Sequence, residues 1–243
     1  MNPGSGLRST ARRLAAGAGI AAATYAGYAG VTGMRYGRAA RPATGEDDSL
    51  LDRFMPSYEV VDRQHIAVAA PAAVTLAAAR ELDLMGSRVV RMIFRGRELI
   101  LGATGEDRPR PRGLIAEVRS LGWEVLADVP DRQIVIGAVT KPWEANVVFR
   151  GIPADRFAAF SEPGYVKIAW TLRADPVGGG ASIFRTETRA LATDATARAK
   201  FRWYWSWLSP GIVLIRLLSL GPVKAEAERR ARSRLTLSAT ACL

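Results

Sequence analysis

The sequence predicts an α+β fold in which a curved antiparallel sheet closes around a long C-terminal helix. The elements follow one another as a strand, then helices, then a run of strands separated by turns, and finally a helix with an aromatic stripe. In addition, 49% of the 243 residues are hydrophobic and 23% are charged, a balance typical of a chain with a real core. A sheet that packs against a helix can leave an apolar hollow between the two layers, and such hollows bind small molecules.

The first half of the domain is expected to hold one strand and three short helices. Alternation of apolar and polar residues predicts the strand, and apolar residues three or four apart predict the helices. Pro71 suits the first turn of a helix. The loop at 102–113, which is rich in arginine, proline and glycine, separates the second helix from the third. The expected ranges are 58–70 for the strand, and 72–84, 87–101 and 114–121 for the helices.

The second half is expected to complete the sheet. After Gly122 the apolar period changes to two, which predicts a hairpin around Pro130-Asp131 and a second hairpin around Gly178-Gly179-Gly180. The triple glycine is not a phosphate loop, because a strand and not a helix follows it. The expected strands are 123–129, 133–139, 146–149, 164–174 and 181–191.

The last helical region carries the aromatic stripe. Asp194 is expected to cap its N-terminus. Four apolar residues three or four apart then form one face, namely Phe201, Tyr204, Trp205 and Leu208. Pro210 is expected to interrupt or restart the helix. Core packing against the sheet is the simplest interpretation of the stripe, and a role as a cavity wall is compatible with it.

Residues 14–34 form a stretch without a charge, flanked by arginines on both sides. About 20 residues of helix are needed to cross a bilayer, so the length fits a membrane anchor. A cleaved secretory signal and a soluble alanine-rich helix are the alternatives. We therefore expect a basic tail with an anchor or signal-like helix over 1–38, a linker over 39–53, a ligand-binding domain over 54–232 and a tail over 233–243.

The flanking charges give the expected location. The short basic N-terminal tail slightly favours an N-terminus inside the cell, which would place the folded domain outside the cytoplasm. The expectation is a single-pass protein of the cell membrane. The sequence does not determine the oligomeric state.

Composition also excludes several classes of function. The formal charge of +11 suggests nucleic acid or anionic membrane, but the basic residues cluster weakly and no zinc spacing or recognition-helix pattern is present, so we expect no nucleic-acid partner. The single cysteine, Cys242, allows no intrachain disulfide, and the single histidine, His65, leaves no zinc cluster or usual catalytic triad. No metal and no cofactor are expected.

Several segments resemble one protein family. The strand Ser182-Ile183-Phe184-Arg185-Thr186-Glu187-Thr188-Arg189, followed by Thr193-Asp194-Ala195, Tyr204-Trp205 and Pro210, resembles the C-terminal half of uncharacterised bacterial members of the START-related SRPBCC superfamily. The hairpin between Gly122 and Trp143 and the turn at Glu162-Pro163-Gly164-Tyr165 are similar to the same group. The resemblance implies a helix-grip fold with a deep apolar pocket. The superfamily includes lipid and sterol carriers, hormone receptors and polyketide cyclases, and it shares no catalytic motif, so no catalytic residue is assigned.

The expected function is binding of a hydrophobic small molecule, such as a lipid, an isoprenoid or a polyketide-like compound, in an apolar cavity. Glu187 has two interpretations: ion pairs with Arg185 and Arg189 on their shared strand face, which we favour, or an anchor for a polar group of the ligand. The alternative function is a polyketide cyclase or dehydratase-like enzyme that uses Glu187 as acid or base, with His65 and Tyr165 as the other choices. The candidate ligand-binding residues are Trp123, Trp143, Trp170, Phe184, Glu187, Tyr204 and Trp205.

Overall fold

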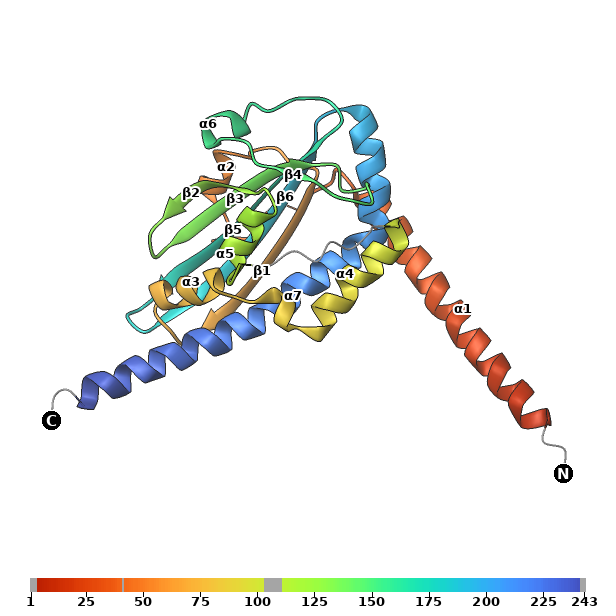
Figure 1. Cartoon of the computed structure of the whole chain (residues 1–243), viewed down its shortest axis with the longest axis horizontal. Coiled ribbons are helices and arrows are strands. Elements are labelled where there is room, and N and C mark those ends of the chain that lie inside the picture. Colours follow the sequence, from red (N-terminus) through yellow and green to blue (C-terminus); the bar gives the residue numbers. More distant parts are fainter. Residues whose placement is uncertain (1–3, 41, 103–110, 241–243) are drawn as a thin grey trace.

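The computed structural model describes residues 4–40, 42–102 and 111–240, and Figure 1 shows their arrangement. In this part of the chain, six strands form one antiparallel sheet: β1 (Val60–Val68), β2 (Glu124–Val129), β3 (Gln133–Thr140), β4 (Phe149–Arg150), β5 (Val166–Val177) and β6 (Ala181–Ala192). Their order is β1-β6-β5-β3-β2, and β4 pairs with β3. Both expected hairpins are present. The strand expected at 146–149 is shorter and lies later, at Phe149–Arg150.

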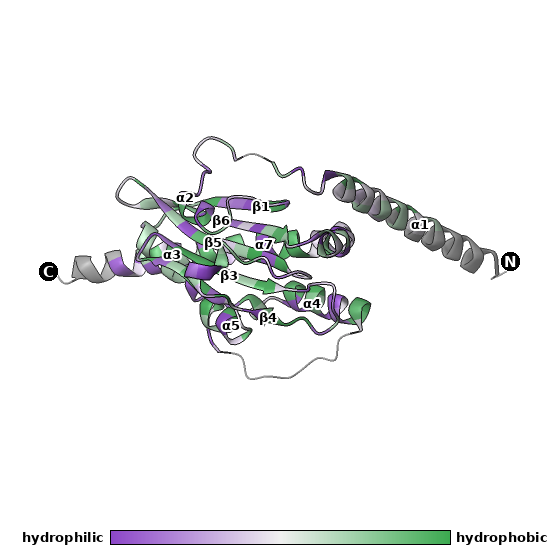
Figure 2. Cartoon of the chain, turned by 90° about the horizontal axis from the view of Figure 1, so that it is seen from above, coloured by the Kyte–Doolittle hydropathy of each residue, from purple (hydrophilic) through white to green (hydrophobic). Residues whose placement is uncertain are grey.

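The helices are α1 (Gly4–Arg35), α2 (Ser49–Asp52), α3 (Ala72–Arg80), α4 (Arg88–Leu101), α5 (Leu114–Ser120), α6 (Ala154–Phe157) and α7 (Ala195–Thr240). A short 3-10 turn at Leu84–Gly86 follows α3, so the helix predicted over 72–84 ends earlier than expected. The α7 helix lies against the sheet beside α3 and α4 (Figures 1 and 2). The predicted α+β class, with a curved antiparallel sheet and a long C-terminal helix, is confirmed.

One face of the sheet, here called the helix-facing side, carries the main core. Phe184 of β6 and Ile136 of β3 pack there with Leu76 of α3 and with Val223 and Ala227 of α7. Phe184 and Ile136 are almost completely buried. Because side chains alternate along a strand, this contact places the even-numbered residues of β6 toward α7 and the odd-numbered ones toward the opposite, back face.

The back face is covered by the segment that precedes β1. Leu51 and Met55 pack there with Phe157 of α6 and with Val135 and Ala169 of the sheet, and Leu51 is fully buried. The region predicted as a linker over 39–53 is therefore part of the packed domain in its second half. Its acidic residues concealed this in the sequence, because several of them pair with side chains of the sheet: Asp48 is buried and accepts from Gln133, and Asp52 pairs with Arg189.

The α7 helix is continuous through Pro210, where an interruption was expected, and Figure 1 shows it bending in its first half. Proline removes a helical hydrogen bond and commonly bends a helix without ending it. Among the described residues, one helix is long and apolar enough to cross a bilayer, and it is α7 over Ala195–Arg234. The stretch 14–34, expected as a transmembrane-like helix, is helical and lies within α1. Its role as an anchor stays a prediction.

Some expectations concern residues outside those described. The arginine-rich loop at 102–113 includes 103–110, and the C-terminal tail includes 241–243 with Cys242; both of these stretches lie outside the described residues. The basic residues Arg229 and Arg230, near the end of α7, are described and form ion pairs with Glu226 of the same helix.

Candidate functional site

The aromatic residues predicted to bind a ligand all come to the helix-facing side, but in two groups. The first group contains Trp123, Trp170 and Phe184 and packs with the main core. The rings of Trp123 and Trp170 contact each other edge to face, with 6.2 Å between their centroids. Phe149 of β4 extends this group, with its ring 4.9 Å from that of Trp123.

The second group contains Trp143, Tyr204 and Trp205 and surrounds Phe201 in the first part of α7. The rings of Phe201 and Tyr204 stack with centroids 6.1 Å apart. This group packs on Ile168 of β5, so the aromatic stripe of α7 is core, as the simplest interpretation held.

The two groups differ from an ordinary core in one respect. Phe184 and Tyr204 are buried, but Trp123, Trp170 and Ile168 keep partial exposure although they lie on the helix-facing side of the sheet. Large apolar side chains thus present accessible surface beside α7. Such surface is what a hydrophobic ligand needs for binding.

A polar cluster, here called the Asp62–Arg216 pair, lies on the same side. Asp62 Oδ2 of β1 is 2.5 Å from Arg216 Nε of α7. Arg216 also donates from Nη2 to the hydroxyl of Thr186, at 3.0 Å, and Gln64 donates to Asp62 Oδ1, at 2.9 Å. The Asp62 and Arg216 side chains are largely buried, so an ion pair with hydrogen-bonding neighbours sits within an otherwise apolar layer.

Register places this pair in line with the first aromatic group. Asp62 is the strand partner of Thr188, which in turn is the partner of Trp170, so the three residues share one row on the helix-facing side. Sequence reasoning missed the pair. One signal in the sequence could have indicated it: Arg216 is the only charged residue between Arg202 and Lys224. An isolated charge on an apolar helix needs a partner of opposite charge.

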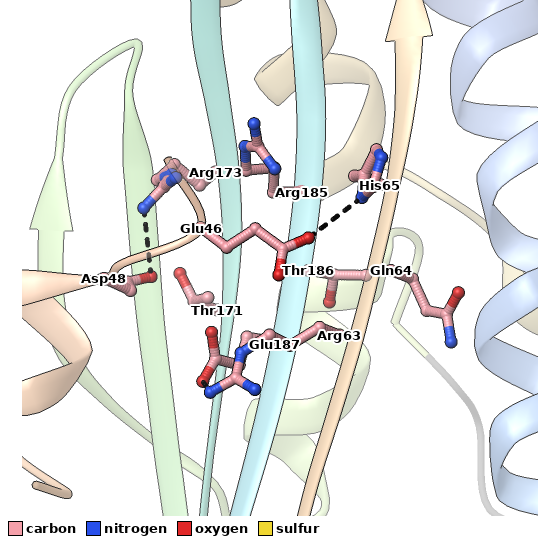
Figure 3. A pocket seen from close by; sticks show the side chains of 10 residues that line it. All are labelled: Glu46, Asp48, Arg63, Gln64, His65, Thr171, Arg173, Arg185, Thr186 and Glu187. Atoms are coloured by element: carbon pink, nitrogen blue, oxygen red, sulfur yellow. Dashed lines mark ion pairs between the residues drawn. The ribbon is translucent and has the colours of Figure 1, made fainter. Parts of the chain in front are cut away.

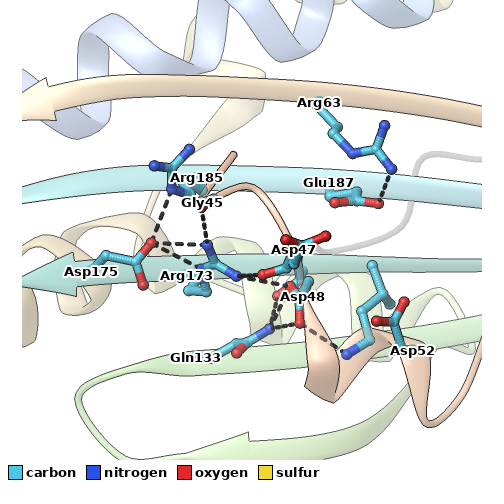
Figure 4. A network of polar contacts seen from close by, with 12 residues as sticks. Gly45, Asp47, Asp48, Asp52, Arg63, Gln133, Arg173, Asp175, Arg185 and Glu187 are labelled. Atoms are coloured by element: carbon cyan, nitrogen blue, oxygen red, sulfur yellow. Dashed lines mark hydrogen bonds and ion pairs between the residues drawn. The ribbon is translucent and has the colours of Figure 1, made fainter. Parts of the chain in front are cut away.

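Glu187 lies on the other face. Its Oε1 is 3.1 Å from Arg63 Nη2, a pair that Figure 4 shows. The same oxygen is 2.7 Å from Arg189 Nε, and Arg189 also contacts Asp52. Burial alone would lower the pKa of Arg189, but its hydrogen bonds to Glu187 and Asp52 outweigh burial and raise the pKa. Glu187 therefore forms ion pairs, as the favoured interpretation expected. Arg63 takes the place of Arg185, which pairs with Asp175 instead.

A small polar hollow adjoins this network (Figure 3). Its volume of about 20 Å³ is enough for a water molecule or two, since one water needs roughly 10–15 Å³ by the same measure. The residues lining it are Glu46, Asp48, Arg63, Gln64, His65, Thr171, Arg173, Arg185, Thr186 and Glu187. This volume excludes a substrate of lipid or polyketide size.

The candidate acid and base residues are thus spread over the molecule. His65 lines the polar hollow, exposed, with Nδ1 3.5 Å from Glu46 Oε1. Tyr165 lies elsewhere, under the cations of Lys141 and Arg150. In the described parts of the chain, no group of three or more histidine, cysteine, aspartate or glutamate side chains is arranged to hold a metal ion.

No protein-family model matches the sequence, and a search of curated proteins finds no match. Similar solved structures include CalU16 from Micromonospora echinospora, with 12% identity over 71% of this chain and 85% of that chain and a TM-score of 0.23. They also include the Zhui aromatase/cyclase from Streptomyces sp. R1128, with 14% identity over 70% and 94% of the two chains and a TM-score of 0.21. The fold class rests on the sheet order and on the packing of α7, not on these distant alignments.

Proposed function

We propose that this protein is a membrane-tethered, helix-grip domain that binds a hydrophobic small molecule between its sheet and α7. The observation that carries the proposal is the accessible apolar surface of Trp123, Trp170 and Ile168 beside the buried Asp62–Arg216 pair. Apolar walls with a few fixed polar groups are the usual composition of a small-molecule site. The resemblance to the START-related SRPBCC superfamily supports the same function.

The polar pair narrows the class of ligand. A compound that is mostly hydrocarbon or aromatic, with one hydroxyl, carbonyl or carboxylate group, would pack on the tryptophans and direct that group toward Arg216. Lipids, isoprenoids and polyketide-like compounds all meet this description.

The tether is the second part of the proposal. We propose that residues 14–34 cross the membrane once and that the folded domain lies outside the cytoplasm. Reporter fusions at the C-terminus test the orientation: a reporter that is active only outside the cytoplasm should be active. Activity confined to a cytoplasmic reporter would overturn the proposed side.

Native mass spectrometry of the full chain, purified in mild detergent, tests ligand binding. We expect a small molecule to remain bound and to be lost from Trp170→Ala, which removes a wall of the site. Trp203→Ala should retain it, because Trp203 is exposed and belongs to neither aromatic group. A chain that carries no small molecule, and that takes up no added fatty acid or isoprenoid alcohol, would contradict the proposal.

The enzyme alternative has less support. It relied on Glu187 as acid or base, but Glu187 is paired with two arginines on the back face and adjoins a hollow too small for a substrate.

A further inference from the structure

We propose that α4 is a membrane-docking helix whose exposed apolar stripe enters the interfacial layer of an anionic bilayer. The stripe consists of Val89, Met92, Leu99 and Ile100 and is here called the α4 stripe. The inference goes beyond ligand binding and uses the proposed tether only for its location.

Exposed apolar side chains are concentrated on a few helices. Among the described residues, α1, α4 and α7 each carry five of the large hydrophobic side chains that are exposed, and only Leu121, Val129, Val148 and Val177 lie elsewhere. Soluble proteins scatter such residues singly, whereas a concentration of them marks an interaction site or a membrane contact.

The α4 stripe is the most exposed of these groups. Met92, Leu99 and Ile100 are 70%, 84% and 68% exposed, and together with Val89 they follow helical spacing along one side of α4. Val90, on the other side of the helix, is 1% exposed. A core helix would turn its larger apolar face inward, but here the larger apolar face is turned outward.

Contacts with the rest of the domain hold the stripe in this direction. Ile93 packs so closely on Gly211 of α7 that a Cβ on that glycine would lie 2.9 Å from the Ile93 side chain. Arg97 donates to the carbonyls of Pro142 and Glu144, at 3.3 and 3.4 Å. The direction of the stripe is therefore set by packing on the adjacent side of α4, where Ile93 and Arg97 lie.

Charge identifies a lipid surface as the occupant. Arg88, Arg91 and Arg95 are exposed on α4, while Glu98 is its only acidic residue. An apolar stripe bordered by arginines is typical of helices that lie in the interface of membranes with anionic lipids.

The position of α4 relative to the tether agrees with this. The hydroxyl of Tyr25 donates to the carbonyl of Trp207, and the hydroxyl of Tyr28 is 3.2 Å from that of Ser209, so α1 is joined to α7 within a few residues of Gly211. Figure 1 shows α1, α4 and α7 meeting at one end of the molecule. Because Tyr25 and Tyr28 lie within the proposed span 14–34, a tether through α1 would hold this part of α7, and α4 packed on it, against the bilayer.

The test places an environment-sensitive NBD dye on the stripe of the full chain. Cys242→Ser removes the single native thiol, and Leu99→Cys is then labelled. The protein is reconstituted in vesicles of phosphatidylcholine alone and of phosphatidylcholine and phosphatidylglycerol in equal parts. We expect several-fold brighter, blue-shifted emission in the mixed vesicles, with quenching by lipids that carry a nitroxide near the headgroup. The control is Val129→Cys, at the end of β2, where the native side chain is 40% exposed and a dye should emit as in water.

Each other outcome would overturn the proposal. If vesicles float with the protein while the dye on Leu99 emits as in water, the tether holds but α4 does not dock. If the protein floats with neither vesicle, then neither the tether nor α4 binds lipid, and both proposals fail. If the blue shift occurs in detergent without vesicles and grows with protein concentration, a second copy of the chain covers the stripe instead of lipid.

Discussion

Asp62 of β1 and Arg216 of α7 form an ion pair with 2.5 Å between Oδ2 and Nε, joining the sheet to its helix inside an apolar layer. The pair spans 154 positions of sequence, and Arg216 reaches Thr186 of β6 from the same place. Arg216 alone thus links α7 to two neighbouring strands, β1 and β6.

Removing one partner of this pair should destabilise the fold. Arg216→Met leaves the Asp62 carboxylate buried without its cation, so we expect the free energy of unfolding to fall by about 3 kcal/mol, measured by urea unfolding. The double variant Asp62→Asn with Arg216→Met should recover part of the loss, because no uncompensated charge remains. Losses that simply add would show that the two residues are not coupled.

Glu187 should behave as a structural residue. Glu187→Gln leaves Arg63 and Arg189 without their shared carboxylate, so we expect a loss of about 3 kcal/mol in unfolding free energy, while the bound small molecule is retained in native mass spectrometry. The matched control is Glu162→Gln, which breaks the exposed pair with Arg150 and should cost roughly 0–1 kcal/mol. Loss of the ligand from a folded Glu187→Gln protein would restore the anchor interpretation.

The sequence predicted most strands and helices because their periodicity is local. The change to a period of two after Gly122 and the glycine turn at 178–180 are enough to define both hairpins. The alternation in β6 also separated Phe184, Thr186 and Thr188 from Arg185, Glu187 and Arg189.

The alternation alone does not predict which face of the sheet α7 covers. The choice depends on contacts between distant segments: Leu51 covers the back face, and Val223 packs on the other. The partnership of Asp62 with Arg216 is long-range in the same way. The acidic residues near Asp48 looked solvated, yet Asp48 accepts hydrogen bonds from the buried amide of Gln133.

Acid should weaken the start of α7 through Asp194. Its Oδ1 accepts from the backbone N–H groups of Thr196 and Ala197, at 2.7 and 2.9 Å, and its Oδ2 accepts from Gly164. The hydrogen bonds from Ala197 and Gly164 lower the pKa of Asp194. Because the pKa is lower in the folded state, the stabilisation is complete above the unfolded-state pKa of about 3.9 and is lost as pH falls through the folded-state pKa.

Asp194→Asn isolates this effect, because asparagine also caps helices but cannot be protonated in this range. In thermal unfolding measured from pH 7 to pH 2, the unfolding temperature of the wild type should exceed that of the variant at neutral pH. This difference should narrow below about pH 4. A gap that stays constant across the series would mean that the charge of Asp194 contributes nothing.

Gly137 of β3 should tolerate no side chain. A Cβ there would lie 2.6 Å from Leu126 Cδ1 and 2.7 Å from Phe157 Cε2, and both neighbours are buried on the back face. Gly137→Ala therefore forces overpacking, and we expect a loss of about 1–3 kcal/mol in the free energy of unfolding. Gly179→Ala, in the open β5–β6 turn with nothing within 4 Å, is the control and should change stability by less than about 0.5 kcal/mol. Equal urea midpoints for the two variants would show that α6 can move away from the sheet and that the back-face packing is looser than these distances require.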